Sequence, residues 1–279
     1  MRLLIILSLL IAPSVSHAIT YDPSLKDKQV LDFGKKHECV VVIKCLLNEK
    51  PLMYSLGSGV LIAEDVVLTA AHVVHQGTKH EVICNGKHYA VSASVIHSKF
   101  SAKRFGYGDI AVVFLKEKIK QDFYPALYTK QDEIGKVCSI AGWGRHGNFK
   151  DGHGKDCDGL RRAGSNIVDR VDREMLMCSP SKDGDGSRMT TLECLVSPGD
   201  SGGGMFIAGK LAGLHSILTT THEKGKGYTL NGGYTNVCGS TRVSIYVDWI
   251  NDTIEKCRGH FRLIDQATKA IEDLKKLRD

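Results

Sequence analysis

Short runs of β-branched and other apolar residues recur along most of the chain, separated by turn-forming residues. The first half contains such runs at residues 40–43, 59–62, 66–68, 82–83 and 110–115. The second half contains them at residues 137–141, 167–171, 205–207, 211–218 and 243–247. Many short runs, spaced roughly ten residues apart, predict the strands of a β-barrel or a β-sandwich. Glycine is also frequent, at 29 of 279 residues, which agrees with a chain of many turns.

The composition is that of a globular protein with a mild positive charge. Apolar residues make up 42% of the chain and charged residues 24%, and its length suffices for one large domain or two small ones. The formal net charge is +6, but no run of five or more basic residues occurs. The sequence therefore predicts no nucleic-acid partner.

The first 18 residues have the pattern of a secretory signal peptide. Arg2 supplies a positive charge, residues 3–12 are almost entirely apolar, and small residues end the stretch at Ser16 and Ala18. A membrane anchor would need about 20 apolar residues, and Pro13 interrupts this shorter run. We therefore predict cleavage after Ala18, a secreted or periplasmic location, and no membrane span.

All nine cysteines follow this leader, at positions 39, 45, 84, 138, 157, 178, 194, 238 and 257. An exported chain with this many cysteines is expected to form disulfides, and an odd number leaves at least one thiol free or paired with another molecule. The spacing does not identify the pairs. No Cys-x-x-Cys spacing occurs, so a zinc site of that type is not predicted.

The rest of the chain divides into four expected segments. They are an extended arm over residues 19–36, a strand-rich half over 37–125, a second strand-rich half over 126–250, and a helical tail over 251–279. The arm is polar and lacks periodicity, whereas apolar residues near the end recur at helical spacing on both sides of Gly259, which is expected to break the helix. Surface loops are expected at residues 144–159, 181–188 and 219–237.

Three residues in different segments can act together in nucleophilic catalysis. His72 ends one apolar segment, Asp109 immediately precedes another, and Ser201 lies in the glycine-rich run 199–204. A serine is a weak nucleophile until a neighbouring base accepts its proton. Flanking glycines let the backbone bend so that amide groups converge on one point and stabilise an oxyanion there. Because the three residues come from both halves, we expect the site in a cleft between them.

Four motifs give the chain a resemblance to the trypsin/chymotrypsin-like serine proteases, and to their bacterial secreted members in particular. They are Thr69-Ala-Ala-His72, Asp109-Ile-Ala-Val-Val-Phe-Leu115, Ala141-Gly-Trp-Gly144 and Gly199-Asp-Ser-Gly-Gly203. The resemblance extends over about residues 36–257. It implies an all-β fold of two antiparallel β-barrels of the chymotrypsin type, with the active site in the cleft between them.

The resemblance also implies a role for each matching residue. His72 would be the general base and then the general acid, Asp109 would orient it, and Ser201 would be the nucleophile. The backbone N–H groups of Gly199 and Ser201 would form the oxyanion hole, and Ser216 would help to hold Asp109. The implied activity is that of a serine endopeptidase, which cleaves proteins or peptides through an acyl-enzyme and needs no cofactor.

The chain departs from the family at cysteine positions and at the N-terminus. Val73, Ser197 and Ile207 stand where many relatives have cysteines, so the disulfide plan differs from theirs. The Ile-Val-Gly-Gly motif, whose freed N-terminus pairs in relatives with the residue that matches Asp200, is absent. Either no activating cleavage is needed, or Ile19, exposed by signal cleavage, forms that ion pair.

The residues expected to contact the substrate side chain are Leu195, Val196, His215, Ser216, Ile217 and Leu218. A preference for Lys or Arg needs an acid at the base of the pocket, where this chain has Leu195. An apolar preference is therefore the first expectation. His215 matches the histidine that binds a substrate carboxylate in glutamyl endopeptidases, so a preference for Glu stays open, as does a purely structural role for His215.

Other functions and ligands receive less support from the sequence. A catalytically silent binding protein could keep the same fold, but an intact reactive trio favours an enzyme. An esterase of the α/β-hydrolase type would need the order Ser, Asp, His, which is the reverse of this one. Two groups of residues are interpreted as loop or surface residues rather than metal ligands: His146, His153 and Cys157, and His80, Cys84 and His88. We predict no metal, and the oligomeric state stays open.

Overall fold

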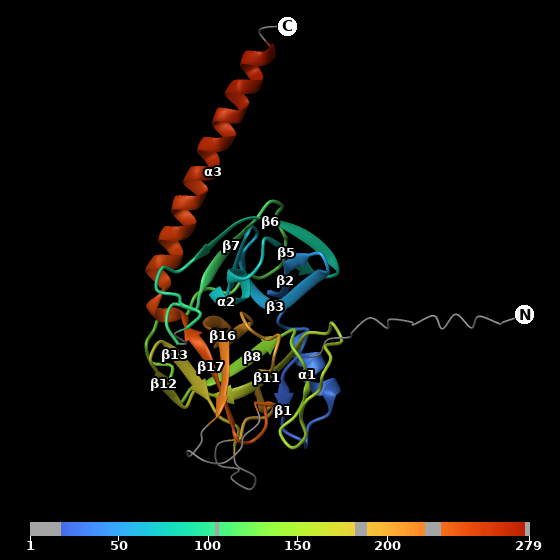
Figure 1. Cartoon of the computed structure of the whole chain (residues 1–279). Coiled ribbons are helices and arrows are strands. Elements are labelled where there is room, and N and C mark those ends of the chain that lie inside the picture. The colour runs from blue at the N-terminus through green and yellow to red at the C-terminus, as the bar shows by residue number, and fades with distance from the viewer. Residues whose placement is uncertain (1–17, 104–105, 182–188, 221–229, 277–279) are drawn as a thin grey trace, which may run out of the picture.

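The computed structural model describes residues 18–103, 106–181, 189–220 and 230–276, with the side chains of 272–276 left out. Its first lobe is a closed six-stranded β-barrel in the order β2-β3-β4-β7-β6-β5 (Figure 1). The strands are β2 (Val40–Glu49), β3 (Leu52–Ala63), β4 (Val66–Thr69), β5 (Lys79–Cys84), β6 (Lys87–Ile96) and β7 (Ala111–Leu115). The structure thus confirms the prediction of an all-β fold.

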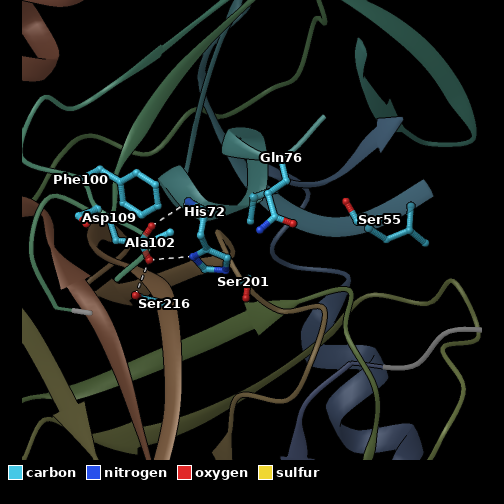
Figure 2. Close-up of a pocket in the computed structure, with 11 residues that line it drawn as sticks. Ser55, His72, Gln76, Phe100, Ala102, Asp109, Ser201 and Ser216 are labelled. Atoms are coloured by element: carbon cyan, nitrogen blue, oxygen red, sulfur yellow. Dashed lines mark hydrogen bonds and ion pairs between the residues drawn. The ribbon is translucent and has the colours of Figure 1, made fainter. Parts of the chain in front are cut away.

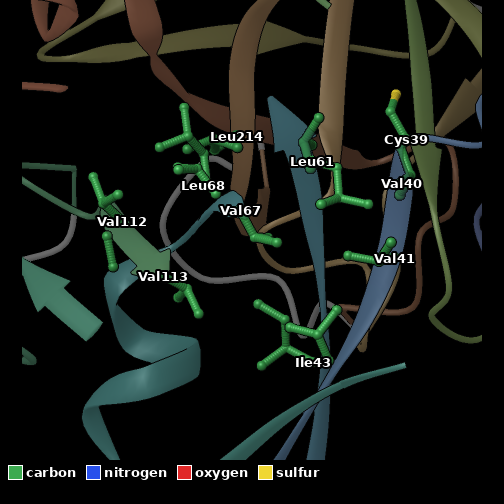
Figure 3. Packing of buried hydrophobic residues seen from close by; sticks show 14 of the residues in the cluster. Cys39, Val40, Val41, Ile43, Leu61, Val67, Leu68, Val112, Val113 and Leu214 are labelled. Carbon is green, nitrogen blue, oxygen red and sulfur yellow. The ribbon is translucent and has the colours of Figure 1, made fainter. Parts of the chain in front are cut away.

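The apolar runs of the sequence form the inside of this barrel. Every residue of β4 and β7 is buried, and the two strands pair antiparallel with Leu68 opposite Val112. Figure 3 shows Ile43, Val67 and Val113 pointing into one packed interior. Burying each such side chain contributes about 1.5–3 kcal/mol, so these runs dominate the stability of the lobe.

The second lobe is built on a seven-stranded antiparallel sheet in the order β11-β8-β15-β16-β17-β13-β12. The strands are β8 (Val137–Gly142), β11 (Arg162–Ile167), β12 (Arg170–Asp172), β13 (Met175–Cys178), β15 (Gly204–Ile207), β16 (Lys210–Thr220) and β17 (Asn236–Arg242). Three strands separate β8 from β13, yet the sulfurs of Cys138 and Cys178 lie 3.9 Å apart. The sheet therefore curls strongly around its own interior.

The N-terminal segment is not the extended arm that the sequence predicts over residues 19–36. Strand β1 (Thr20–Tyr21) pairs with β14 (Cys194–Leu195) and β9 (Gly147–Asn148), and β9 pairs with β10 (Gly152–His153). Helix α1 (Asp27–Gly34) follows and packs on β11. The buried guanidinium of Arg162 forms a two-pronged ion pair with Asp27 in its first turn. Eight residues are too few for a helical periodicity to show in the sequence.

The C-terminal part is more helical than the sequence suggests. Residues 243–247, predicted as a strand, form the 3₁₀ turn η1 (Val243–Ile245) and the start of α3 (Val247–Lys276). Helix α3 continues through Gly259, where the sequence predicts a break. Its first turns lie against the body and its later turns project beyond the first lobe (Figure 1). A glycine costs a helix only about 1 kcal/mol, which neighbouring turns can tolerate.

Some predicted features cannot be compared with the structure. The described residues leave out positions 1–17 of the predicted signal peptide (1–18), positions 182–188 of the loop expected at 181–188, and positions 221–229 of the loop expected at 219–237. Where the structure describes the chain, none of its helices is long and apolar enough to cross a membrane.

Candidate active site

A cavity of about 390 Å³ opens between the two lobes, and the reactive residues meet in its wall. Its lining consists of Ser55, Leu56, His72, Val73, Gln76, Phe100, Ser101, Ala102, Asp109, Ser201 and Ser216. His72 lies in the short helix α2 (Ala71–His75), directly after β4. Asp109 lies just before β7, and Ser201 lies in the turn between β14 and β15. The structure thus brings together the three residues that the sequence singles out.

Asp109 holds both the backbone and the ring of His72. Its Oδ1 accepts a hydrogen bond from the His72 amide N–H at 2.9 Å, and its Oδ2 lies 2.8 Å from Nδ1 of the ring. Ser216 on β16 donates to the same Oδ2 at 2.5 Å (Figure 2). Burial by itself raises the pKa of Asp109, but the hydrogen bonds from His72 and Ser216 outweigh it and lower that pKa below its usual value. Asp109 is therefore ionised at neutral pH.

The second lobe fixes Asp109, although Asp109 belongs to the first. Besides Ser216, Thr241 of β17 donates its hydroxyl to the Asp109 carbonyl at 2.9 Å. Gly108 before it has φ +60°, and a side chain there would collide with the backbone of Lys99 and Phe100. The position of the carboxylate thus depends on both lobes and on one glycine in a left-handed conformation.

Ser201 lies in a turn whose glycines also adopt conformations that other residues avoid. Gly199 has φ +98° and Gly202 has φ +81°. Ser58 of β3, in the first lobe, binds this turn through two hydrogen bonds. Its N–H donates to the Ser201 carbonyl at 2.7 Å, and its hydroxyl donates to the Gly199 carbonyl at 3.0 Å. Among the described residues, no hydrogen bond occupies the amide N–H of Gly199 or of Ser201.

Figure 2 shows the ring of His72 between the Asp109 carboxylate and Ser201. Within the described part of the chain, Ser201 Oγ makes no hydrogen bond to His72. Such contacts are often long in the absence of substrate and tighten when it binds. The arrangement has what acyl transfer requires: a hydroxyl, an imidazole with an anion behind it, and two free amide donors.

Asp200, next to Ser201, is completely buried and receives the N-terminal segment. Its Oδ2 accepts a hydrogen bond from the Ile19 N–H at 3.1 Å, and its Oδ1 accepts one from the Gly144 N–H at 2.8 Å. Burial raises the pKa of Asp200 to about 6 despite these hydrogen bonds and those from Ser197. Ile19 is also fully buried, with φ +52°, a strained value for a β-branched residue.

A second, smaller cavity of about 170 Å³ shares Ser201 and Ser216 with the first. Its lining consists of Val196, Ser197, Pro198, Ser201, His215, Ser216, Ile217 and Leu218. Leu195, predicted as a substrate contact, is not part of it. Leu195 pairs with Thr20 in the β1–β14 ladder, and its side chain is fully buried in the core of the second lobe.

His215 belongs to this cavity but lies deep beneath its surface. Its Nδ1 lies 3.0 Å from the Ser240 hydroxyl, and no hydrogen bond to Nε2 is present in the described residues. Burial lowers the pKa of His215 to about 3, so the ring is neutral at pH 7. His215 therefore offers a hydrogen bond here and no positive charge.

Sequence patterns did not reveal the residues that hold the reactive ones in place. Ser58 and Thr241 make their contacts to residues more than 100 positions away in the chain, so no local spacing marks them. The glycines around Ser58, in Gly57-Ser58-Gly59, were the one available signal of a close backbone approach. Across the part of the chain that the structure describes, no three His, Cys, Asp or Glu residues are grouped as a metal site.

Comparisons with known proteins agree with this architecture. The family model described as Trypsin matches residues 36–250, well over half of the chain. Among solved structures, neuropsin, a serine protease expressed in the limbic system of mouse brain, is 18% identical with a TM-score of 0.58, over 79% of this chain and 96% of its own. A structure titled HL collagenase is 16% identical with a TM-score of 0.59, over 88% of this chain and 99% of its own. At these identities the two structures establish the fold alone. The family match establishes that the chain belongs to the trypsin family and is a serine endopeptidase.

Proposed function

We propose that this protein is an exported endopeptidase that hydrolyses peptide bonds with Ser201 as nucleophile, His72 as general base and Asp109 as its orienting group. The observation that carries the proposal is the pair of hydrogen bonds from His72 to the ionised Asp109, in the wall of the cavity that Ser201 also lines. An anion at Nδ1 places the ring proton there and leaves Nε2 free to accept a proton.

The reaction then follows from the positions of these groups. Nε2 of His72 accepts the Ser201 proton as Oγ attacks the carbonyl carbon of the substrate. The resulting imidazolium is stabilised by Asp109 and protonates the leaving amine, which gives an acyl-enzyme. A water molecule repeats the two steps, releases the acid product and restores Ser201.

The free amide N–H groups of Gly199 and Ser201 are the proposed oxyanion hole. Two donors that the fold itself leaves unpaired need no rearrangement when charge develops on the substrate oxygen. Each such donor is worth roughly 3 kcal/mol in the transition state. The positive φ of Gly199 supports this role, because it sets the direction of the neighbouring amides.

The smaller cavity beside Ser201 is the proposed pocket for the substrate side chain before the scissile bond. Val196, Pro198, Ile217 and Leu218 supply the apolar half of its lining, and its described lining contains no carboxylate. We therefore expect apolar side chains to be preferred over Lys and Arg. A neutral His215 weakens the case for Glu, since the pocket then holds no cation to pair with a carboxylate.

Loss of the hydroxyl of Ser201 is the direct test of the proposed mechanism. We expect Ser201→Ala to lower kcat/KM on a casein substrate by roughly 10⁴-fold or more while the thermal unfolding temperature stays unchanged. A fluorophosphonate probe should label the unmodified protein and not the variant. Wild-type cleavage by the variant would reject Ser201 as the nucleophile, and an unlabelled, inactive wild type would favour a silent binding protein.

Export and maturation form the second part of the proposal. We infer that signal cleavage after Ala18 turns the Ile19 amide into an ammonium group, which forms an ion pair with Asp200. The short distance from Ile19 N to Asp200 and the strained φ of Ile19 support this, because cleavage removes the bond that defines that angle. The pair would stabilise the turn that carries Ser201.

N-terminal sequencing of the exported, active protein tests this maturation. The expected first residue is Ile19. The control is Ala18→Gln, which puts a large side chain where the peptidase needs a small one, and whose uncleaved product should have at least tenfold lower activity. A first residue well beyond Ile19, or full activity of the uncleaved product, would contradict the proposed ion pair.

A further inference from the structure

The second lobe encloses three cysteines whose side chains meet in its interior. Cys138 of β8, Cys178 of β13 and Cys238 of β17 are all buried in one apolar cluster, and all nine cysteines of the chain are free thiols in the structure. We propose that Cys138 and Cys178 form a disulfide across this interior when the protein folds in an oxidising compartment. The inference rests on the proposed export for its biological setting.

The distance between the two sulfurs carries the proposal. Cys138 Sγ and Cys178 Sγ lie 3.9 Å apart, whereas a disulfide bond is about 2.05 Å long. Each sulfur would have to move by roughly 1 Å, which side-chain rotation can supply without displacing the strands. The two cysteines lie on opposite sides of the curled sheet, so the bond would cross its interior rather than join neighbouring strands.

Cys238 is the competing partner, and strand geometry disfavours it. Cys178 and Cys238 are directly opposite each other in the antiparallel pair β13–β17. Directly opposed residues have Cβ atoms about 4.5–5.5 Å apart, whereas a disulfide needs about 3.8 Å. A bond between them would therefore pull two hydrogen-bonded strands together, while a bond to Cys138 leaves both ladders intact.

The chemistry is thiol–disulfide exchange with a disulfide oxidant, such as a disulfide-bearing oxidoreductase or oxidised glutathione. The thiolate of one cysteine attacks the oxidant's disulfide and releases one of its sulfurs as a thiol. The second cysteine then attacks this mixed disulfide and releases the other sulfur. The two cysteines lose two electrons and two protons in total, and the oxidant gains them.

This exchange must happen before the interior of the lobe closes. Hydrogen bonding with Cys138 and Cys238, together with burial, raises the pKa of Cys178 well above its usual value. The folded core therefore suppresses the thiolate that exchange requires. The disulfide would form on the folding chain, and the closed lobe would then shield it from reduction.

The bond would stabilise the region that receives the N-terminus. Ile19, Leu195, Cys138 and Cys178 belong to the same buried cluster, so the bond would lie in the core that also buries the N-terminal segment. A link between β8 and β13 would restrict the opening of this core. We therefore expect it to raise the resistance of the second lobe to heat.

The test maps the bond directly in the chain as it exists. The Ser201→Ala protein is refolded with reduced and oxidised glutathione, its remaining thiols are alkylated under denaturing conditions, and its peptides are identified by mass spectrometry without reduction. We expect a linked pair of peptides containing Cys138 and Cys178. A bond between Cys178 and Cys238, or alkylation of both Cys138 and Cys178, would overturn the proposal.

Substitutions separate the bond from general packing effects. Cys138→Ala and Cys178→Ala should each abolish the link and the effect of dithiothreitol on the unfolding temperature, which in the parent should fall by roughly 5–15 °C on reduction. Cys238→Ala, from the same cluster, should keep both the link and the sensitivity. Persistence of the dithiothreitol effect in Cys138→Ala would also reject the pair. Because Ser201 is absent throughout, these outcomes do not depend on the proposed mechanism.

Discussion

Asp200 is a fully buried carboxyl group whose charge depends on what lies opposite it. In the uncleaved chain its partners are backbone N–H groups and the Ser197 hydroxyl, and burial raises its pKa from the ordinary value of 3.8 to about 6. The folded state therefore holds this proton more tightly than the unfolded state. The stability that Asp200 contributes is complete below pH 4 and is lost as the pH rises through about 6.

This shift predicts a pH dependence for the uncleaved Ser201→Ala protein. Its free energy of unfolding should lose about 2.4 kcal/mol between pH 4 and pH 7 relative to the same protein with Asp200→Asn, which cannot ionise. Denaturant unfolding at several pH values measures the difference. The protein that begins at Ile19 should show a smaller loss, because an ammonium group favours the ionised carboxylate; equal losses in both forms would argue against that pairing.

For the predicted site residues, the sequence placed some close together as the structure has them and did not place others. His72, Asp109, Ser201 and Ser216 line one cavity, as expected, because their local motifs are specific. Leu195, expected among the substrate contacts, does not line the smaller cavity; it pairs with Thr20 of an N-terminal strand that the sequence did not reveal.

The turn from Gly199 to Gly204 is an element whose shape is imposed by the strands around it. A side chain on Gly202 would overlap the Thr69 hydroxyl of β4 and the Ser58 carbonyl of β3, in addition to the strain of its positive φ. Gly209, in the hairpin between β15 and β16, has a similar φ of +74° but open space around it.

These two glycines separate backbone strain from steric overlap. Gly209→Ala should cost about 1–2 kcal/mol, the strain of a left-handed alanine alone. Gly202→Ala should cost several kcal/mol more and lower kcat/KM by at least tenfold, because Ser201 must shift with the turn. Chemical denaturation and kinetics on the two variants measure both effects. Equal stability losses would mean that the first lobe does not constrain this turn.

Elements with a clear pattern were predicted and those without one were not. The fully apolar run of β7 is unmistakable in the sequence. Strands β6 and β17 do not stand out in the sequence, because they mix polar and small residues. Their strand conformation depends on pairing with neighbouring strands. Helix α1 is short and depends on the Arg162–Asp27 ion pair, a contact that no local pattern encodes.

At the scale of the whole molecule, α3 is divided between a packed part and a free part. Phe261 contacts Phe114 of β7, with ring centroids 5.6 Å apart. Residues 262–271 are all exposed. The helix thus packs against the first lobe as far as Phe261, and the stretch 262–271 beyond it is exposed.

A pair of variants tests this division. Removal of residues 264–279 should change the unfolding temperature by no more than about 2 °C and leave kcat/KM unchanged, since the described side chains of that stretch, residues 264–271, are all exposed. Phe261→Ala in the full chain should lower the unfolding temperature by roughly 3–8 °C. Differential scanning calorimetry of the two proteins makes the comparison. A large destabilisation by the truncation would show that the exposed turns support the fold.

Ser58 gives the molecule a further property. Its backbone and hydroxyl, both from the first lobe, bind the two carbonyls that flank Asp200, and the carbonyl of Asp109 is bound in return by Thr241 of the second lobe. Each lobe thus holds a reactive segment of the other by hydrogen bonds: the first lobe holds the turn of Ser201, and the second lobe holds Asp109. Partial separation of the lobes would break both sets of hydrogen bonds and, in the same event, the alignment of the Ser201 hydroxyl with the His72 imidazole. A partly open molecule should therefore be inactive rather than slow or unselective.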